Sequence, residues 1–100
     1  MEETIVKIEK ATAKNKKYSA YIKNKKTGKT RKINFGDSRY ENFKDSTPLK
    51  LFSNKNHGDK KRRENYFLRH SGTKSKVEAI KKEKEKGIFT PKLLSHMYLW

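Results

Sequence analysis

Residues 57–70 (HGDKKRRENYFLRH) hold the side chains best suited to chemistry, because two histidines and an aspartate lie there among five lysines and arginines. His57, Asp59 and His70 are of the types that ligate zinc, but such a site needs three or four converging ligands. Two histidines thirteen residues apart, in a chain without cysteine, are weak evidence for one. We therefore expect Asp59 to cap a helix and His70 to lie near the negative end of its dipole, with no metal or cofactor bound.

The same stretch offers groups for nucleic-acid strand chemistry, in which a tyrosine nucleophile acts beside an arginine clamp. The candidates are Arg62, Arg63, Tyr66, Arg69 and His70. A chain of 100 residues is a small scaffold for placing such a substrate, and the stretch has no carboxylate cluster of the kind a two-metal nuclease uses. We expect Tyr66 to be a core residue and the protein not to be an enzyme.

The elements that position these side chains follow from the hydrophobic pattern. Residues 4–9, 18–23 and 30–35 are β-branched or alternate between apolar and polar side chains, which is typical of strands. Gly28 lies in a turn signal between the second and third segments, so residues 18–35 are predicted to form an antiparallel hairpin. The first segment could extend it to a three-stranded sheet.

The second half of the chain is predicted to be helical. Asp59, Ser75 and Thr90 are N-cap residues ahead of helices near residues 60–70, 76–86 and 91–99. Tyr66 and Phe67 should be buried against the sheet, with Ile33 and Phe35 as neighbours. The expected fold is α+β in one small domain: a β-rich part (1–36), an irregular extended arm (37–57) with one helical turn around residues 49–52, and a helical part (58–100).

The composition points to an anionic partner. Lysine and arginine number 27 against 11 acidic residues, which gives a net charge of +16, and hydrophobic residues make up only 31%. Such a charge favours nucleic acid, an acidic protein surface or an anionic membrane, and no small-molecule substrate is expected. The absence of cysteine excludes disulfides, and no apolar run reaches the roughly 18 residues of a membrane span. The acidic start, Met1 to Thr4, lacks a signal-peptide pattern, so we expect a location inside the cell.

A basic ribbon with aromatic residues is the strongest indication of a nucleic-acid surface. From Lys14 to Lys32 there are nine lysines and arginines and no acidic residue, with Tyr18 and Tyr21 among them. Such a ribbon can follow phosphates and stack on bases, and a basic helix start can add phosphate contacts. The polyanion-binding candidates on the hairpin and on the first helix are Lys23, Lys25, Lys26, Lys29, Arg31, Lys60, Lys61, Arg62, Arg63 and Arg69.

The C-terminal segment LLSHMYLW is the densest apolar stretch. It is either the main core element or an anchor in another protein, because tryptophan and tyrosine are typical interface anchors. The anchor candidates in this segment and on the first helix are Tyr66, Phe67, Leu94, Met97 and Trp100.

Several of these segments together resemble a known family. The residues are Asn34 to Ser38 (NFGDS) followed by Tyr40, then His57 to His70 (HxDxxRRxxYxxRH), then Thr90-Pro91 and the Leu99-Trp100 ending. In this pattern the chain resembles a family of short, basic, uncharacterised proteins encoded by large DNA viruses of eukaryotes. The resemblance implies a viral setting and no particular activity.

Two functions from different classes fit these observations. The first is a virion structural protein of the minor-capsid or cement kind, which would bridge acidic capsid surfaces through its charge and aromatic anchors. Its location would be the virion, and the host-cell interior during assembly. The alternative is a viral protein that binds DNA or RNA for packaging or condensation, which the net charge supports without any resemblance.

Overall fold

Three antiparallel strands form a sheet in the order β1-β2-β3: β1 (Glu3–Lys10), β2 (Lys16–Asn24) and β3 (Thr30–Asp37). The computed structural model describes residues 1–100. The predicted hairpin is present, and its central strand β2 also pairs with β1, so the three-stranded alternative is confirmed. The small α+β fold expected from the sequence is likewise confirmed.

A bulge explains why the first strand alternates only in part. The register between β1 and β2 shifts between Ile5 and Lys7, which places Ile5 opposite Ile22 and Ile8 opposite Ala20. A bulge inserts one unpaired residue, so two side chains three positions apart reach the same face. Val6, the extra residue, is 59% exposed.

The four helical segments are η1 (Ser53–Lys55), α1 (Lys60–Ser71), α2 (Lys76–Lys84) and α3 (Pro91–Tyr98). The three predicted N-caps are confirmed: the side chains of Asp59, Ser75 and Thr90 accept hydrogen bonds from backbone N–H groups in the first turns. Helix α2 ends two residues earlier than predicted, and α3 ends one residue earlier than predicted. The helical turn that was predicted around residues 49–52 is found instead at residues 53–55, as η1.

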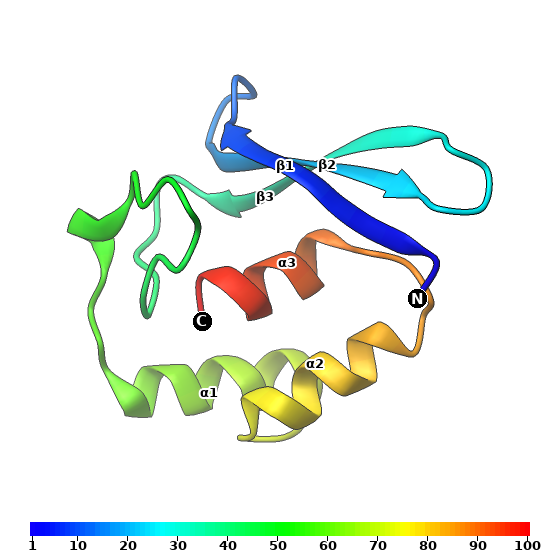
Figure 1. The fold of residues 1–100 in the computed structure, drawn as a ribbon. Coiled ribbons are helices and arrows are strands. Elements are labelled where there is room, and N and C mark those ends of the chain that lie inside the picture. Colours follow the sequence, from blue (N-terminus) through cyan, green and yellow to red (C-terminus); the bar gives the residue numbers. More distant parts are fainter.

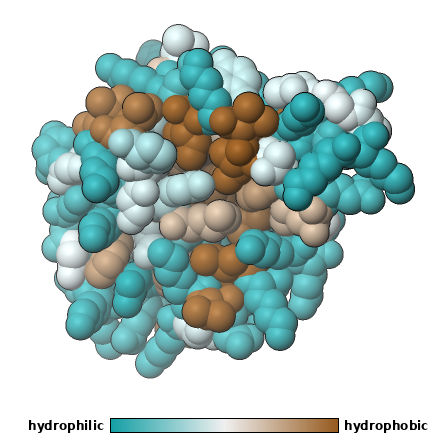
Figure 2. Space-filling view, in the orientation of Figure 1, coloured by the Kyte–Doolittle hydropathy of each residue, from teal (hydrophilic) through white to brown (hydrophobic).

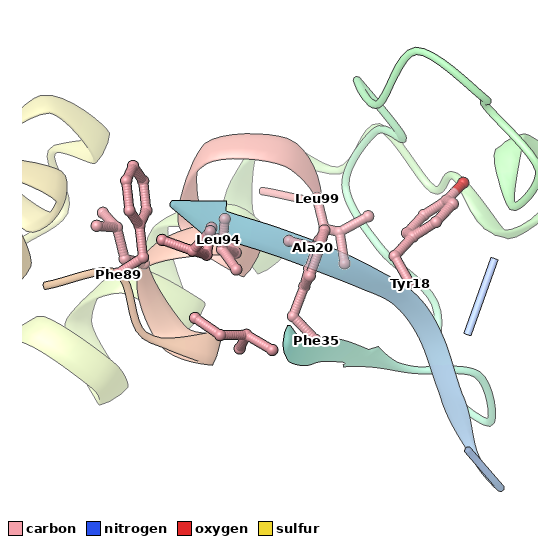
Figure 3. Packing of buried hydrophobic residues seen from close by; sticks show 9 residues of the cluster. Tyr18, Ala20, Phe35, Phe89, Leu94 and Leu99 are labelled. Atoms are coloured by element: carbon pink, nitrogen blue, oxygen red, sulfur yellow. The ribbon is translucent and has the colours of Figure 1, made fainter. Parts of the chain in front are cut away.

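The helix α3 lies between the sheet and the other two helices, so the molecule has three layers (Figure 1). Leu93, Leu94 and Leu99 are fully or almost fully buried and contact the inner face of the sheet (Figure 3). The buried residues that meet them are Tyr18, Ala20, Ile22, Ile33, Phe35 and Phe89. The apolar C-terminal segment is therefore the main core element, one of the two roles that its sequence allowed.

A glycine is required where α3 leaves this core. Gly36 in β3 has a positive φ of 76°, and an added Cβ would lie 2.8 Å from the Leu99 Cδ1 atom. A larger residue would clash there and would be strained in that backbone conformation. The Phe35-Gly36 step thus lets the end of the chain approach the sheet closely.

Tyr66 and Phe67 are buried as predicted, but their neighbours are not the ones expected. Both belong to a second cluster with Ala79 of α2, and Trp100 packs against it. The Phe67 ring lies 5.1 Å from the His96 ring of α3. The expected contact with Ile33 and Phe35 is wrong because α3 occupies the space between α1 and the sheet.

The arm is irregular, as predicted, but it is folded onto the core. The backbone N–H groups of Phe43 and Lys44 donate to the Leu99 carbonyl at 3.0 and 3.2 Å, and that of Ser46 donates to the Tyr98 carbonyl at 2.8 Å. Beneath it, the Asp45 carboxylate accepts hydrogen bonds from four groups: the Tyr18 hydroxyl, the hydroxyl and N–H of Thr47, and the Phe52 N–H. Buried polar groups whose hydrogen bonds are satisfied in this way fix the loop in one arrangement.

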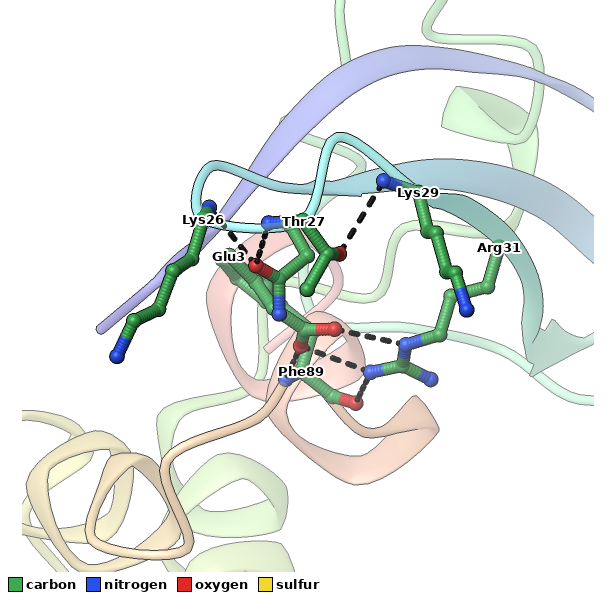
Figure 4. A network of polar contacts seen from close by, with 7 residues as sticks. Glu3, Lys26, Thr27, Lys29, Arg31 and Phe89 are labelled. Carbon is green, nitrogen blue, oxygen red and sulfur yellow. Dashed lines mark hydrogen bonds and ion pairs between the residues drawn. The ribbon is translucent and has the colours of Figure 1, made fainter.

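A polar clamp joins the N-terminal strand to the segment before α3 (Figure 4). The carboxylate of Glu3, which is 8% exposed, accepts two hydrogen bonds of 2.8 Å from Arg31 and one of 2.7 Å from the Phe89 N–H. Arg31 also donates to the Phe89 carbonyl at 2.7 Å. The hydrogen bonds from Arg31 hold the pKa of Glu3 below its usual value.

The surface seen in Figure 2 is hydrophilic around its margins, and hydrophobic residues gather over the sheet and below it. The exposed apolar side chains are Met1, Val6, Leu49, Leu51, Leu68, Val77 and Ile88, with Tyr40. None of the helices combines the length and the apolar character that crossing a membrane requires.

Truncating Phe67 to alanine should lower the free energy of unfolding by about 3–5 kcal/mol, because the ring is fully buried. Leu68→Ala, next to it on the exposed side of α1, is the matched control and should cost less than about 1 kcal/mol. Urea denaturation followed by circular dichroism measures both. Equal losses for the two variants would contradict the burial of α1 against α3.

Candidate functional site

A cleft of about 710 Å³ opens where the arm, α1 and α3 meet the start of β2 and the end of β3. Gly36 and Leu99 form part of its wall, and Tyr66 and Trp100 contribute aromatic surface. The remaining lining residues are Lys16, Lys17, Asp37, Arg39, Tyr40, Glu41, Arg62, Arg69, His70, Pro91, Lys92 and Ser95.

The cleft carries an excess of positive charge, with six lysines and arginines against two carboxylates. Each carboxylate already has a partner: Asp37 pairs with Arg39 at 2.7 Å, and Glu41 pairs with Arg62 at 3.0 Å. The Arg39 guanidinium holds the pKa of Asp37 far below its usual range, so this pair stays ionised.

Four cations of the cleft have no carboxylate within ion-pair distance: the buried Lys17, and Lys16, Arg69 and Lys92. Lys16 and Arg69 are exposed and Lys92 is half-buried. Lys92 also lies in the first turn of α3, where the helix dipole adds positive potential. Lys16, Arg69 and Lys92 are therefore available to an anion that enters the cleft.

Lys17 is the one cation of the cleft that is buried in its wall. Only 2% of the residue is exposed, and its Nζ atom donates to the Asn42 Oδ1 atom at 2.6 Å and lies 5.8 Å from the centre of the Phe52 ring. Burial lowers the pKa of Lys17 to about 8, so the side chain remains mostly protonated at pH 7. Its charge adds to the potential of the cleft, while its ammonium group is already hydrogen-bonded within the protein.

The aromatic part of the cleft is held rigidly. Tyr66 and Trp100 stack with ring centres 4.2 Å apart and planes 5° apart, and the His57 ring lies 5.3 Å from Trp100. The Tyr66 hydroxyl bonds to the Nδ1 atom of His96 at 2.8 Å, and the Nε2 atom of His96 lies 3.2 Å from the Ser71 hydroxyl. A neutral imidazole has one donor and one acceptor nitrogen, so Tyr66 and Ser71 take opposite roles.

This geometry does not suit Tyr66 to nucleophilic chemistry. The residue is 7% exposed, and burial raises the pKa of its hydroxyl well above 10, so the group stays protonated at neutral pH. The hydroxyl is turned to His96 in the protein interior. The expectation that Tyr66 belongs to the core is confirmed.

The basic candidates on the hairpin are separate from the cleft. Lys23, Lys25, Lys26 and Lys29 are exposed around the turn that joins β2 and β3. Arg31 is bound to Glu3 in the clamp described above, so it is less available to a ligand.

The basic candidates on α1 divide into three groups. Lys60 and Lys61 are exposed in the first turn. Arg62 and Arg69 line the cleft. Arg63 lies with its guanidinium 4.3 Å from the centre of the Phe43 ring, a cation–π contact that attaches the arm to α1.

Most of the anchor candidates are used inside the protein. Phe67 and Leu94 are fully buried, and Tyr66 is nearly so. Met97 and Trp100 are half-buried, and both pack on the core of their own chain. Trp100 thus fills a position on its own domain, one of the two locations its sequence allowed.

The three residues considered as metal ligands are not brought together, since the structure holds no group of three or more histidine, cysteine or acidic side chains that could bind a metal. Asp59 caps α1, as expected, and its backbone N–H donates to the Nδ1 atom of His57 at 2.9 Å. His70 lies in the last turn of α1, with its ring 4.6 Å from that of Tyr66.

Sequence reasoning did not single out Lys16, Arg39 or Lys92 as site residues, nor His96 and Lys17 as buried groups. Lys16 and Lys17 belong to the basic run from Lys14 to Lys32, but nothing in that run distinguishes them from its other lysines. The segments that carry the viral resemblance gave a better indication. Residues from all three of them meet at the cleft, namely Gly36, Asp37, Tyr40, Arg62, Tyr66, Arg69, His70, Pro91, Leu99 and Trp100.

The burial of His96 predicts a pH dependence of stability. Desolvation lowers the pKa of this fully buried side chain from 6.5 to about 4, so the unfolded chain binds more protons between these values. The free energy of unfolding should therefore fall as the pH drops from 6.5 to 4, by up to about 1.4 kcal/mol per pH unit from this group. His96→Gln should reduce this slope more than the matched change His70→Gln, whose side chain is exposed. Equal slopes in wild type and His96→Gln, from urea titrations at several pH values, would contradict the prediction.

Comparison with protein-family models, with curated proteins and with solved structures finds no match to this chain. The viral resemblance therefore stays a prediction, and the basis for a function is the cleft and the charged surfaces around it.

Proposed function

We propose that this protein binds nucleic acid without catalysing a reaction on it, and that phosphates of the nucleic acid occupy the cleft. The observation that carries the proposal is the set of unpaired cations, Lys16, Arg69 and Lys92, around a rigid aromatic floor. The net charge of +16 supports a polymeric anion over a single small one, because the excess charge extends far beyond the cleft.

The contacts in the cleft favour binding without sequence specificity. Phosphate contacts position a protein on nucleic acid but carry no direct sequence information. Lysine supplies a point charge, whereas reading of base edges usually relies on bidentate arginine. Arg62 and Arg39 already pair with Glu41 and Asp37. The free groups are therefore suited to phosphates.

Affinity for duplex DNA should depend steeply on salt, because each cation that contacts a phosphate releases a condensed counterion. The triple variant Lys16→Gln, Arg69→Gln, Lys92→Gln should make the plot of log K against log salt shallower by about 2 to 3. Fluorescence anisotropy with a labelled duplex at several salt concentrations measures the slope.

The matched control removes three exposed charges that lie away from the cleft and have no ion-pair partner: Lys10→Gln, Lys81→Gln, Lys84→Gln. Its slope should stay near the wild-type value. If both triple variants shift the slope equally, the cleft is not the binding site. A separate variant with Lys23, Lys25, Lys26 and Lys29 changed to Gln tests the hairpin, which an unchanged slope would rule out as a phosphate-binding surface.

A virion structural protein of the minor-capsid or cement kind is the second candidate. The observation that favours it is the pair of apolar side chains Leu49 and Leu51, which are 42% and 50% exposed on the arm beside Pro48. Exposed apolar residues on a loop can insert into a neighbouring protein, and the viral resemblance would supply the capsid as that neighbour. Trp100 is less suited to this role, since it stacks on Tyr66.

If the chain is a virion component, Leu49→Ser with Leu51→Ser should reduce its recovery in purified particles several-fold. Its duplex affinity should stay within about twofold, because no charge is removed. Deletion of the last three residues is a poorer test, since the carbonyls of Tyr98 and Leu99 hold the arm and the deletion would disturb the fold. Unchanged recovery of the double variant would argue against capsid anchoring through the arm.

A further inference from the structure

One face of the sheet has no helix against it. All three helices lie on the same side of the sheet (Figure 1). The opposite side presents Lys7, Lys23 and Lys32, all exposed, with Tyr21 half-buried among them. We call these four residues the open sheet face.

The strand register places the tyrosine at the centre of this face. Tyr21 on β2 lies opposite Lys7 of β1 and opposite Lys32 of β3, so one row across the sheet reads lysine, tyrosine, lysine. Lys23 is two residues further along β2 and therefore points to the same side. Neighbouring strands lie about 4.8 Å apart, so the two flanking lysines lie on either side of one aromatic ring.

The Tyr21 ring is held in place by its polar end. Its hydroxyl donates to the Glu9 Oε1 atom at 2.7 Å, and the Nζ atom of Lys7 lies 5.9 Å from the ring centre. Glu9 also pairs with Lys7 at 3.1 Å, whereas Lys23 and Lys32 have no carboxylate partner within ion-pair distance. The hydrogen bond from Tyr21 keeps the pKa of Glu9 below its usual value, so this contact persists at neutral pH.

We infer that the open sheet face binds single-stranded nucleic acid, with one base stacked on Tyr21 and phosphates beside Lys23 and Lys32. The inference rests on the proposed nucleic-acid function and adds a second surface with a preference for unpaired bases. Tyr18, the other tyrosine of the ribbon, is fully buried on the inner side, so Tyr21 alone of the two can reach a base.

A single strand fits this face better than a duplex or an acidic protein. Base stacking on an aromatic side chain needs a base whose π-face is free, which a duplex does not offer. The carboxylates of an acidic protein surface would meet the lysines but would be repelled by the negative face of the Tyr21 ring. The exposed lysines around the hairpin turn, Lys25, Lys26 and Lys29, continue the positive charge beyond Lys23 along the path of a flexible strand.

The test measures binding of three labelled probes by fluorescence anisotropy: a single-stranded oligothymidylate of about fifteen nucleotides, the same strand with abasic sites, and a duplex of equal length. The variants are Tyr21→Leu and, as the matched control that keeps the ring, Tyr21→Phe. Circular dichroism checks that both fold as the wild type does.

Tyr21→Leu should lower the affinity for the oligothymidylate by about 5- to 100-fold, the range that loss of one stacked base gives. Its affinity for the duplex and the abasic strand should change by less than about twofold, and its salt slope should not change, because no charge is lost. Tyr21→Phe should stay close to the wild type for all three probes.

Four other outcomes would each contradict the inference, and they differ in what they imply for the proposed nucleic-acid function. If Tyr21→Leu binds the oligothymidylate as wild type does, the open sheet face is not a stacking surface, while duplex binding through the cleft stands. If the wild type binds duplex but not single strands, the open sheet face is likewise not a stacking surface, and duplex binding through the cleft stands. If it binds the abasic strand as tightly as the oligothymidylate, no base is stacked. If the wild type binds none of the three probes, the proposed nucleic-acid function fails together with the inference.

Discussion

The whole structure depends on the burial of α3 on two sides at once. A chain with only 31% hydrophobic residues has few apolar side chains to bury. Helix α3 lies between the sheet and the other two helices and contacts both layers. Leu93 and Leu94 face the sheet, while His96 contacts Tyr66 and Phe67 on α1. Phe89 and Phe52 also pack on the sheet, but α3 and the Leu99 that follows it supply most of the buried apolar side chains that cover it, and a small sheet needs such a cover to be stable. The short helix α3 therefore sets the order of the three layers.

Polar groups complete a core that apolar residues alone do not fill. Asp45, Glu3 and His96 are buried, and each is hydrogen-bonded to a group that comes from a distant part of the chain. A buried polar group without a hydrogen-bond partner costs free energy, so the fold is favoured only when the group meets its particular partner. Each of these hydrogen bonds therefore fixes two segments relative to each other. This is why the arm lies on the core although its sequence is polar and irregular. The cleft exists because the arm, held by Asp45 and by the carbonyl of Leu99, closes one of its sides.

The features that the sequence allowed us to predict are those with a local physical cause. Asp59, Ser75 and Thr90 begin helices because their side chains accept bonds from N–H groups two or three residues later. Tyr18, Ala20 and Ile22 share a face because a strand repeats every two residues. The neighbours of Phe67 could not be predicted, because they depend on which layer α3 enters, and either order of layers satisfies the same apolar pattern. The meeting of Lys16, Arg69 and Lys92 in the cleft could not be predicted either, because they come from elements far apart in sequence. Arg69 was a candidate through its basic helix, whereas no local signal marks Lys16 or Lys92.

The two proposed surfaces have different relations to the core, and this difference bears on how the protein could act. The cleft is built from α1, α3 and the arm on the helical side of the sheet, whereas the open sheet face turns away from α3. A strand held on one surface cannot also occupy the other without passing around the sheet edge, so two separate segments would meet one molecule from different sides. A small basic protein with two such surfaces would draw segments of nucleic acid together, and the repulsion between their phosphates would be offset by the net charge of +16. If both surfaces bind, condensation of nucleic acid, one of the roles expected from composition, follows from their geometry. If only the cleft binds, each protein molecule would hold a single segment of nucleic acid.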